Sequence, residues 1–83
     1  MSQPIIEFDA HGLTVDQAIR QIEALIAKCD SGTYRIRVIH GYHRGNNIQR
    51  AIYDEIDRGR NPKVVRVIGG SNPGITELVL REY

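Results

Sequence analysis

The dipeptide His-Gly occurs twice in this chain of 83 residues, at positions 11–12 and 40–41, each time between an apolar run and a helical pattern. Glycine permits the sharp turn that leads from a strand into a helix. If the two preceding strands are parallel neighbours, His11 and His40 lie at their carboxyl ends, about 5 Å apart along the backbone. Ligands bind at that edge of open α/β sheets. Two imidazoles beside helix N-termini, which favour anions, indicate phosphodiester chemistry.

Asp9 precedes His11 by two residues. Side chains at that spacing on a strand point to the same face, so the Asp9 carboxylate can orient the His11 ring for general acid-base catalysis. The alternative is structural. Asp9 would then brace the turn into the first helix, and His11 would be a polar turn residue.

The loop at 40–47 reads His-Gly-Tyr-His-Arg-Gly-Asn-Asn and leads into a helix. We predict that Arg44 clamps a phosphate and that Tyr42 stacks on an unpaired base. His40 or His43 would supply the second proton transfer. Backbone amides would bind the phosphate. The other predicted binding residues of the loop are Gly41, Gly45, Asn46 and Asn47. The alternative is an exposed loop whose polar residues tolerate the turn.

A divalent metal ion bound by the same histidines and Asp9 is an alternative to acid-base chemistry, because imidazole and carboxylate both ligate metals. No cofactor is required by the residues alone. Attack by a ribose 2′-hydroxyl would need no metal and would leave DNA uncut, whereas attack by water favours a metal. The chain has no Walker loop, and its single cysteine, Cys29, excludes a zinc ribbon and an internal disulfide.

The composition, 41% hydrophobic and 25% charged, is that of a soluble globular protein. The length predicts one domain over residues 1–83, with its core in 5–81. No apolar run approaches the roughly 20 residues of a membrane span, and the N-terminus does not resemble a signal peptide. We therefore expect a cytoplasmic protein without a membrane partner; its oligomeric state is not readable.

Charge is unevenly distributed along the chain. Residues 35–66 contain eight Lys or Arg and three Asp or Glu, a net charge of +5, whereas the rest carries −4. A basic half favours an anionic partner, most commonly nucleic acid. The alternative is that several of these arginines cover a solvated sheet face.

Local patterns predict two helices and four strands. Thr14 and Gln17 form the signature of a capping box before an apolar stripe that reaches Cys29, and Ser31-Gly32 stops this helix. A second helix starts at Asn46 or Asn47 and ends by Gly59 or Pro62. Strands are predicted at 5–10, 34–39, 64–68 and 75–80.

Each strand alternates charged and mostly apolar positions, so one face of the sheet is charged. The charged positions are Glu7, Asp9, Arg35, Arg37, Arg66 and Glu77, and Val65 is expected on the apolar face. A doubly wound sheet would be apolar on both faces. We therefore predict an α/β (α+β) fold, a two-layer β-α-β-α-β-β sandwich in which a mixed four-stranded sheet carries two helices on one face. The last strand is antiparallel to the third, and the strand order is not fixed.

Three ordered motifs resemble the small MutS-related (Smr) domain family. Residues 8–15, Phe-Asp-Ala-His-Gly-Leu-Thr-Val, resemble its Leu-Asp-x-His-Gly-x-x-Val signature, and residues 40–45 resemble His-Gly-x-Gly-x-Gly, with His43 at the middle glycine position. Residues 74–80 resemble the closing Gly-x-Thr strand. In the second helix, Gln49 falls where the family has arginine, and Arg50 follows it. We include Arg50 among the binding residues on this basis.

The resemblance covers residues 6–80 and implies a fold similar to the C-terminal domain of bacterial translation initiation factor three. It also implies nucleic-acid binding with nicking endonuclease or endoribonuclease activity, on DNA or on messenger RNA at the ribosome. The short chain is identified as a stand-alone form of the domain. The alternative is a non-catalytic module that binds nucleic acid or the ribosome, and the third alternative is a small-molecule phosphoryl or metal enzyme.

Overall fold

The computed structural model describes residues 4–41, 47–57 and 61–81. Six elements follow one another in the order that the sequence predicts. They are β1 (Ile5–Asp9), α1 (Val15–Lys28), β2 (Arg35–Ile39), α2 (Asn47–Glu55), β3 (Arg66–Gly69) and β4 (Ile75–Val79).

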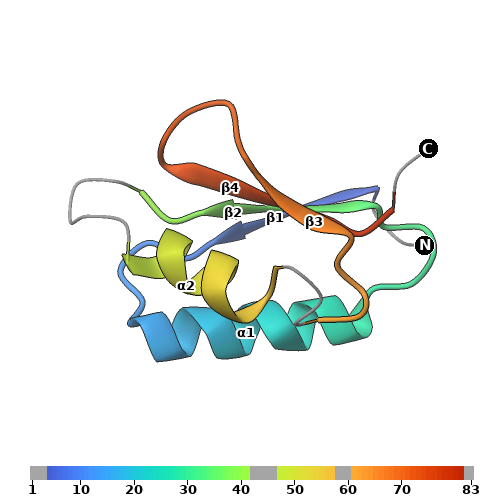
Figure 1. Ribbon diagram of the computed structural model, residues 1–83, viewed down its shortest axis with the longest axis horizontal. Helices are drawn as coiled ribbons and strands as arrows, with labels where there is room; N and C mark the ends of the chain where they lie inside the picture. The colour runs from blue at the N-terminus through green and yellow to red at the C-terminus, as the bar shows by residue number, and fades with distance from the viewer. Residues whose placement is uncertain (1–3, 42–46, 58–60, 82–83) are drawn as a thin grey trace.

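The four strands form one mixed sheet in the order β1-β2-β4-β3, and both helices cover the same face of it (Figure 1). β1 pairs with β2 in parallel, with Asp9 opposite Ile39, whereas β4 is antiparallel to both β2 and β3. The connection through α2 therefore leaves a gap of one strand between β2 and β3, and β4 fills this gap by folding back from β3. The predicted two-layer fold is confirmed, and the structure adds the strand order.

Helix α1 begins as the sequence predicts. Thr14 is its N-cap, and the Gln17 side chain bonds back to the Thr14 amide, completing the capping box. The helix ends at Lys28, and Cys29, which the apolar pattern included in the helix, is the extended C-cap. Lys63 stabilises this end from a distant part of the chain, because its Nζ donates to the carbonyls of Ala27 (3.3 Å) and Cys29 (3.0 Å).

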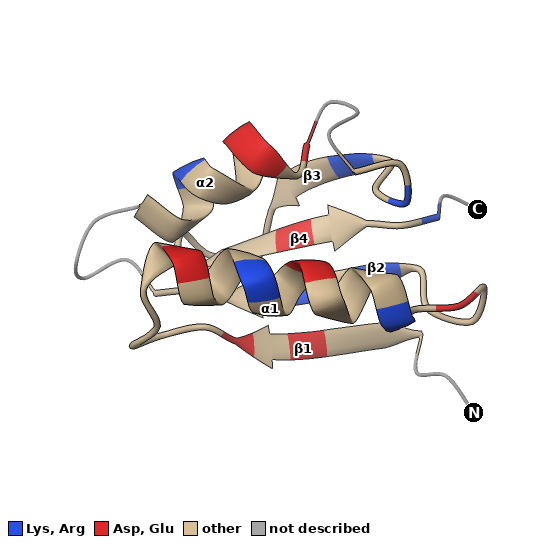
Figure 2. Cartoon of the chain, turned by 90° about the horizontal axis from the view of Figure 1, so that it is seen from below, with Lys and Arg blue, Asp and Glu red and all other residues tan. Residues whose placement is uncertain are grey.

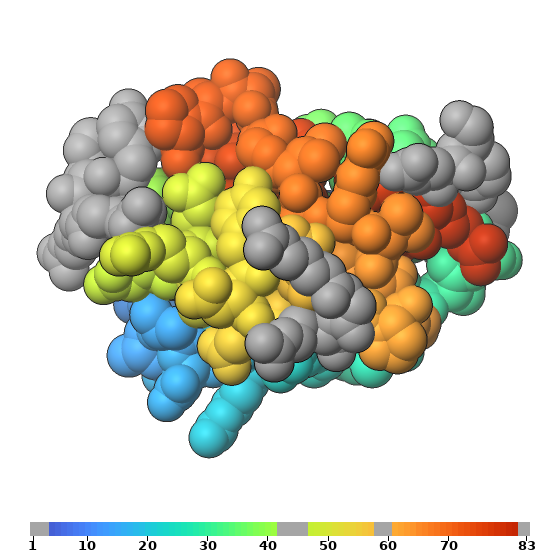
Figure 3. Space-filling view, in the orientation of Figure 1, coloured from blue at the N-terminus to red at the C-terminus, as the bar shows by residue number. Residues whose placement is uncertain are grey.

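The core lies between the sheet and the two helices, and α1 and α2 also pack against each other. Both helices contribute isoleucines that are fully or almost fully buried, and β2, β3 and β4 contribute one or two residues each. The core residues of these elements are Ala18, Ile19, Ile22, Ile26, Ile36, Val38, Ile52, Val67 and Leu78. In the space-filling view, the helices occupy the lower and central part of the molecule, and the hairpin between β3 and β4 forms its upper edge (Figure 3).

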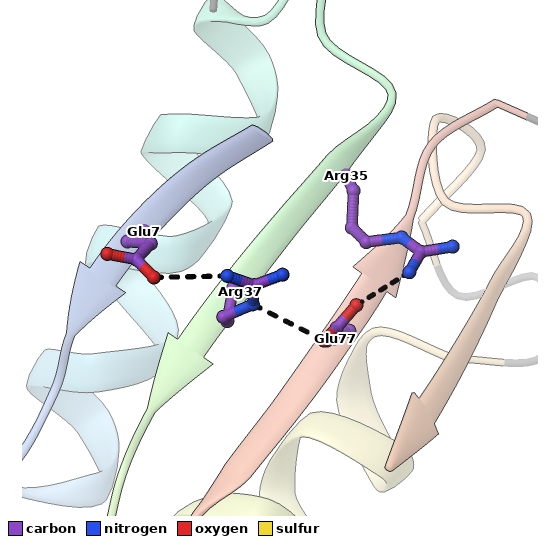
Figure 4. Close-up of polar contacts among 4 residues, drawn as sticks. All are labelled: Glu7, Arg35, Arg37 and Glu77. Carbon is purple, nitrogen blue, oxygen red and sulfur yellow. Dashed lines mark hydrogen bonds and ion pairs between the residues drawn. The ribbon is translucent and has the colours of Figure 1, made fainter. Parts of the chain in front are cut away.

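The sheet face without helices carries a chain of ion pairs across three strands (Figure 4). Arg37 on β2 donates to Glu7 on β1 (3.1 Å) and to Glu77 on β4 (3.3 Å), and Arg35 donates to Glu77 (2.8 Å). The alternation of charged positions is confirmed. Glu77, however, is only 6% exposed, because the two arginine side chains lie against it.

Val65 is an exception to the predicted apolar face, since it is 56% exposed. The strand was expected to begin at residue 64, but β3 begins only at Arg66. Val64 and Val67 are buried, and Val65 and Arg66 lie exposed between them, so the alternation of β3 does not extend back beyond Arg66.

Neither of the helices in the described part of the chain has the length and apolar composition that crossing a bilayer requires.

Candidate active site

One end of the molecule brings together the carboxyl ends of β1 and β2 and the N-termini of both helices. Figures 1 and 2 show these four termini at the same side of the fold. β1 pairs with β2 in parallel, which confirms that the two strands that precede the His-Gly dipeptides are neighbours. The contact continues past the strands, since the amide of Ala10 donates to the carbonyl of Ile39 (2.8 Å). The residues that follow these strands therefore emerge side by side.

Asp9 and His11 form the hydrogen-bonded pair that the sequence predicts. Asp9 Oδ1 lies 2.5 Å from His11 Nδ1 and also accepts the backbone amide of His11 (3.1 Å). A carboxylate only accepts, so Nδ1 carries a hydrogen and the Nε2 atom of the neutral ring is the basic one. The His11 side chain is 76% exposed, which leaves the ring accessible to a ligand.

Hydrogen bonding to His11 lowers the pKa of Asp9 below its ordinary value of 3.8. The ring contact contributes most and the backbone amide of His11 comes second, because both stabilise the charged carboxylate. Asp9 is therefore ionised throughout the physiological pH range, and its carboxylate accepts the hydrogen bond that orients the His11 ring.

His40 has different surroundings, although it follows the adjacent strand. Its Nε2 atom lies 2.7 Å from the Thr76 hydroxyl, and its Nδ1 atom lies 2.7 Å from the carbonyl oxygen of Gly41. Strand alternation places His40 with Val38 and Thr76 on the face that the helices cover, whereas Asp9 belongs to the open face with Glu7. The two histidines therefore belong to separate hydrogen-bonded groups.

Both glycines of the His-Gly dipeptides adopt positive φ angles, 82° at Gly12 and 74° at Gly41. Side chains with a Cβ atom rarely adopt such angles, although neither position would be crowded by one. The prediction that these glycines serve the exits from the strands is consistent with this backbone.

Five residues of the predicted site, Tyr42, His43, Arg44, Gly45 and Asn46, lie outside the described residues. The site residues next to them are placed. Gly41 is half-buried, Asn47 is the exposed first residue of α2, and Arg50 is exposed one turn further along that helix.

The two helix N-termini differ in what they offer an anion. At α1, the side chains of Thr14 and Gln17 already accept hydrogen bonds from two backbone amides, and the acidic Asp16 lies in the first turn. The first turn of α2 has no acidic residue. The α2 end is therefore the better place for a phosphate, because a negative side chain opposes a bound anion.

At least three of the eight basic residues between positions 35 and 66 make contacts within the molecule. Arg35 and Arg37 pair with glutamates, and Lys63 bonds to helix carbonyls. The exposed side of α1 carries charges of both signs (Figure 2). The alternative that the sheet arginines cover a solvated face thus agrees with their contacts.

In the described residues, no group of three or more His, Cys, Asp or Glu side chains is close enough to share a metal ion. His43, which the sequence placed in a metal-binding set, lies outside these residues.

Two residues that contact the His40-Gly41 segment were absent from the predicted site. Thr76 contacts the His40 ring, and the carbonyl of Gly74 accepts the amides of His40 (2.9 Å) and Gly41 (3.0 Å). Gly74 directly precedes β4 and Thr76 is its second residue, so these contacts join residues 33 to 36 positions apart. A threonine among apolar positions of a buried strand was the available sign, because a buried hydroxyl needs a partner.

No protein-family model matches the chain, and no curated protein matches its sequence. The fold, however, is similar to a solved structure: the Smr domain of MutS2 from Thermus thermophilus superposes on this chain with a TM-score of 0.77. The alignment covers 93% of this chain and 99% of that domain, at 24% sequence identity. This chain has the fold of an Smr domain.

The Smr fold is the architecture that the three motifs imply, and the likeness extends over nearly all of the chain. At 24% identity it establishes the arrangement of the elements, whereas chemistry depends on the individual side chains. The function of this Smr fold is therefore argued from Asp9, His11 and their neighbours.

Proposed function

We propose that this chain binds nucleic acid and cleaves it at a phosphodiester bond, with His11 as a general acid-base residue. The observation that carries the proposal is the Asp9-His11 pair. It presents an exposed imidazole whose Nδ1 is held by a carboxylate and whose Nε2 is the basic atom. This is the arrangement that activates a hydroxyl nucleophile.

On RNA, Nε2 of His11 takes the proton of a ribose 2′-hydroxyl, whose oxygen then attacks the adjacent phosphorus. The bond from phosphorus to the 5′-oxygen breaks, and that oxygen leaves with a proton from a second group, for which His43 is the candidate. The products are a 2′,3′-cyclic phosphate and a 5′-hydroxyl. Attack by water would instead nick DNA as well and would favour a metal ion.

The N-terminus of α2 is the proposed place for the phosphate. Its first turn is free of acidic residues, and Arg50 is exposed on the same helix. Arg44 and the amides of Gly45, Asn46 and Asn47 are proposed to bind the phosphate and its developing charge.

The test compares the wild type with His11→Ala on three substrates: a labelled single-stranded RNA, the same sequence as DNA, and a supercoiled plasmid, each with and without EDTA. We expect cleavage of at least one substrate, lowered about 10²–10⁴-fold by His11→Ala. Glu23→Gln, an exposed change on α1, is the matched control and retains the activity. Equal cleavage by the wild type and His11→Ala would exclude His11 from the mechanism.

Binding without cleavage is the second candidate, and the contacts of His40 favour it. Because both ring nitrogens of His40 are engaged, the described residues offer one accessible imidazole rather than two. This candidate predicts salt-sensitive binding to RNA or DNA that weakens on Arg44→Ala, with no cleavage above background.

A further inference from the structure

Thr76 occupies a position in β4 where its hydroxyl is not needed for packing. Its side chain is fully buried, opposite Val38 on β2 and two residues before the buried Leu78. Valine has nearly the same shape and would suit these apolar neighbours. A buried hydroxyl costs free energy unless it has a partner, and here the partner is Nε2 of His40, at 2.7 Å.

We propose that Thr76 is a positioning residue that holds the His40 ring, and that His40 sets the conformation of Gly41 instead of exchanging protons with a substrate. This inference rests on the proposed function, because Gly41 leads into the segment to which phosphate binding is assigned. It gives His40 a different role from the acid-base role that the sequence analysis predicts.

The two ring contacts define one tautomer of His40. The carbonyl oxygen of Gly41 can only accept, so the hydrogen lies on Nδ1. In the neutral ring Nε2 is then an acceptor, and the Thr76 hydroxyl donates to it. A proton transfer to a ligand would first require one of these contacts to break.

Backbone contacts from the start of β4 hold the same segment. The carbonyl of Gly74 accepts both the His40 and the Gly41 amides, and Gly41 has a φ of 74°. Glycine is the least restricted residue, so without the contact from the His40 ring Gly41 would have access to many other backbone conformations. The contact from the His40 ring, which Thr76 holds in place, restricts Gly41 at the point where the predicted binding loop begins.

The first test measures the ring itself and needs no substrate. Nitrogen-15 NMR of the imidazoles distinguishes hydrogen on Nδ1 from hydrogen on Nε2. We expect the Nδ1-H form for His40 in the wild type and in Thr76→Ser, which keeps the hydroxyl. Thr76→Val should keep the hydrogen on Nδ1, which the Gly41 carbonyl holds, but should shift the Nε2 resonance, because Nε2 loses the hydroxyl that donates to it. An Nε2 resonance that is unchanged in Thr76→Val would overturn the role of Thr76.

The second test measures binding and cleavage on the substrates described above. We expect Thr76→Val to weaken them about tenfold and Thr76→Ser to do so no more than about threefold, the effects of losing or keeping one buried hydrogen bond. His40→Asn, whose amide replaces the Nδ1-H donor, should lose less activity than His40→Ala and keep the wild-type pH profile.

Equal losses in His40→Asn and His40→Ala, with one limb of the pH profile missing, would show that His40 transfers protons and would overturn the inference. A wild type that neither binds nor cleaves nucleic acid would overturn the proposed function. The nitrogen-15 resonance of His40 Nε2 would then still decide whether Thr76 holds His40.

Discussion

At the scale of single residues, the two histidines that the sequence treats as equivalent differ in exposure and in partners. His11 is an exposed ring with a carboxylate on one nitrogen, whereas His40 is half-buried with a neighbour on each nitrogen. An imidazole serves as an acid or base only if one nitrogen can reach a ligand. The geometry therefore favours His11 as the reacting group and His40 as part of the scaffold.

The Asp9-His11 contact predicts a change in the titration of Asp9. In His11→Ala the ring contact that lowers the Asp9 pKa is lost, so the pKa rises toward 3.8. Because the pKa of Asp9 is lower in the folded than in the unfolded chain, its contact with His11 stabilises the folded state above pH 3.8. This stabilisation is lost as the pH falls through the pKa of Asp9 in the folded state. Carbon-13 NMR of the Asp9 carboxyl group measures the shift.

His40→Asn is the control for this titration, because His40 contacts Thr76 and Gly41 and should leave the Asp9 pKa low. An Asp9 carboxyl that titrates identically in the wild type and in His11→Ala would contradict the contact.

At the scale of elements, the hairpin between β3 and β4 determines what lies beside the site. Its turn is closed by Gly70, whose amide donates to the Ile75 carbonyl (2.9 Å), and by Asn72, whose side chain accepts the Gly74 amide (2.8 Å). The same turn delivers the Gly74 carbonyl to His40 and Gly41. A short loop without a predicted role in binding thus supports the candidate site.

Gly70→Ala should destabilise this hairpin. A Cβ atom at position 70 would lie 2.4 Å from Ile75 Cγ2 and 2.7 Å from Ile75 Cβ, and the branched Ile75 side chain cannot move away without shifting its strand. We expect a loss of about 1–3 kcal/mol in the free energy of unfolding, as for other overpacked sites. Urea unfolding measures it.

Gly69→Ala is the matched control, since a Cβ atom there has no neighbour within 4 Å. Its stability should stay within about 1 kcal/mol of the wild type. Similar losses in both variants would point to a general intolerance of the hairpin and not to a clash at position 70.

At the scale of the whole molecule, the open sheet face is held by charges that neutralise one another. Glu77 lies between Arg35 and Arg37, and Arg37 also reaches Glu7, so the chain of contacts joins β1, β2 and β4 (Figure 4). These contacts raise the pKa of the Arg37 guanidinium, first through Glu7 and then through Glu77. Arg35 and Arg37 therefore contribute to the net positive charge of residues 35–66 without making this sheet face a basic surface.

Glu77→Gln should destabilise the fold more than Glu7→Gln. Removing the buried Glu77 charge leaves two guanidinium groups together, and we expect a loss of about 2–3 kcal/mol, less than for a fully buried pair because both arginine side chains are about one-third exposed. Glu7 is 60% exposed, so its substitution should cost less than about 1 kcal/mol. Denaturant unfolding of both variants measures the difference, and equal losses would contradict the buried role of Glu77.

The sequence by itself determined the elements, because their signals are local. The capping box of Thr14 and Gln17, the alternation along the strands and the glycines of the two His-Gly dipeptides act within a few residues of each other. The Asp9-His11 pair was predictable for the same reason, since only two positions separate its members. Element boundaries were less accurate: β3 begins two residues later than expected, because the Val64 amide donates to Asn61 in a turn and Val65 makes only a single backbone bond to β4, at Val79.

Only the tertiary structure decided which strand lies beside β2. Alternation is satisfied by several strand orders, but the observed position of β4 beside β2 is what brings Thr76 to His40 and Glu77 to both arginines. These contacts join residues 36 to 42 positions apart. Their formation depends on how the hairpin packs into the sheet, a long-range event that no local pattern encodes.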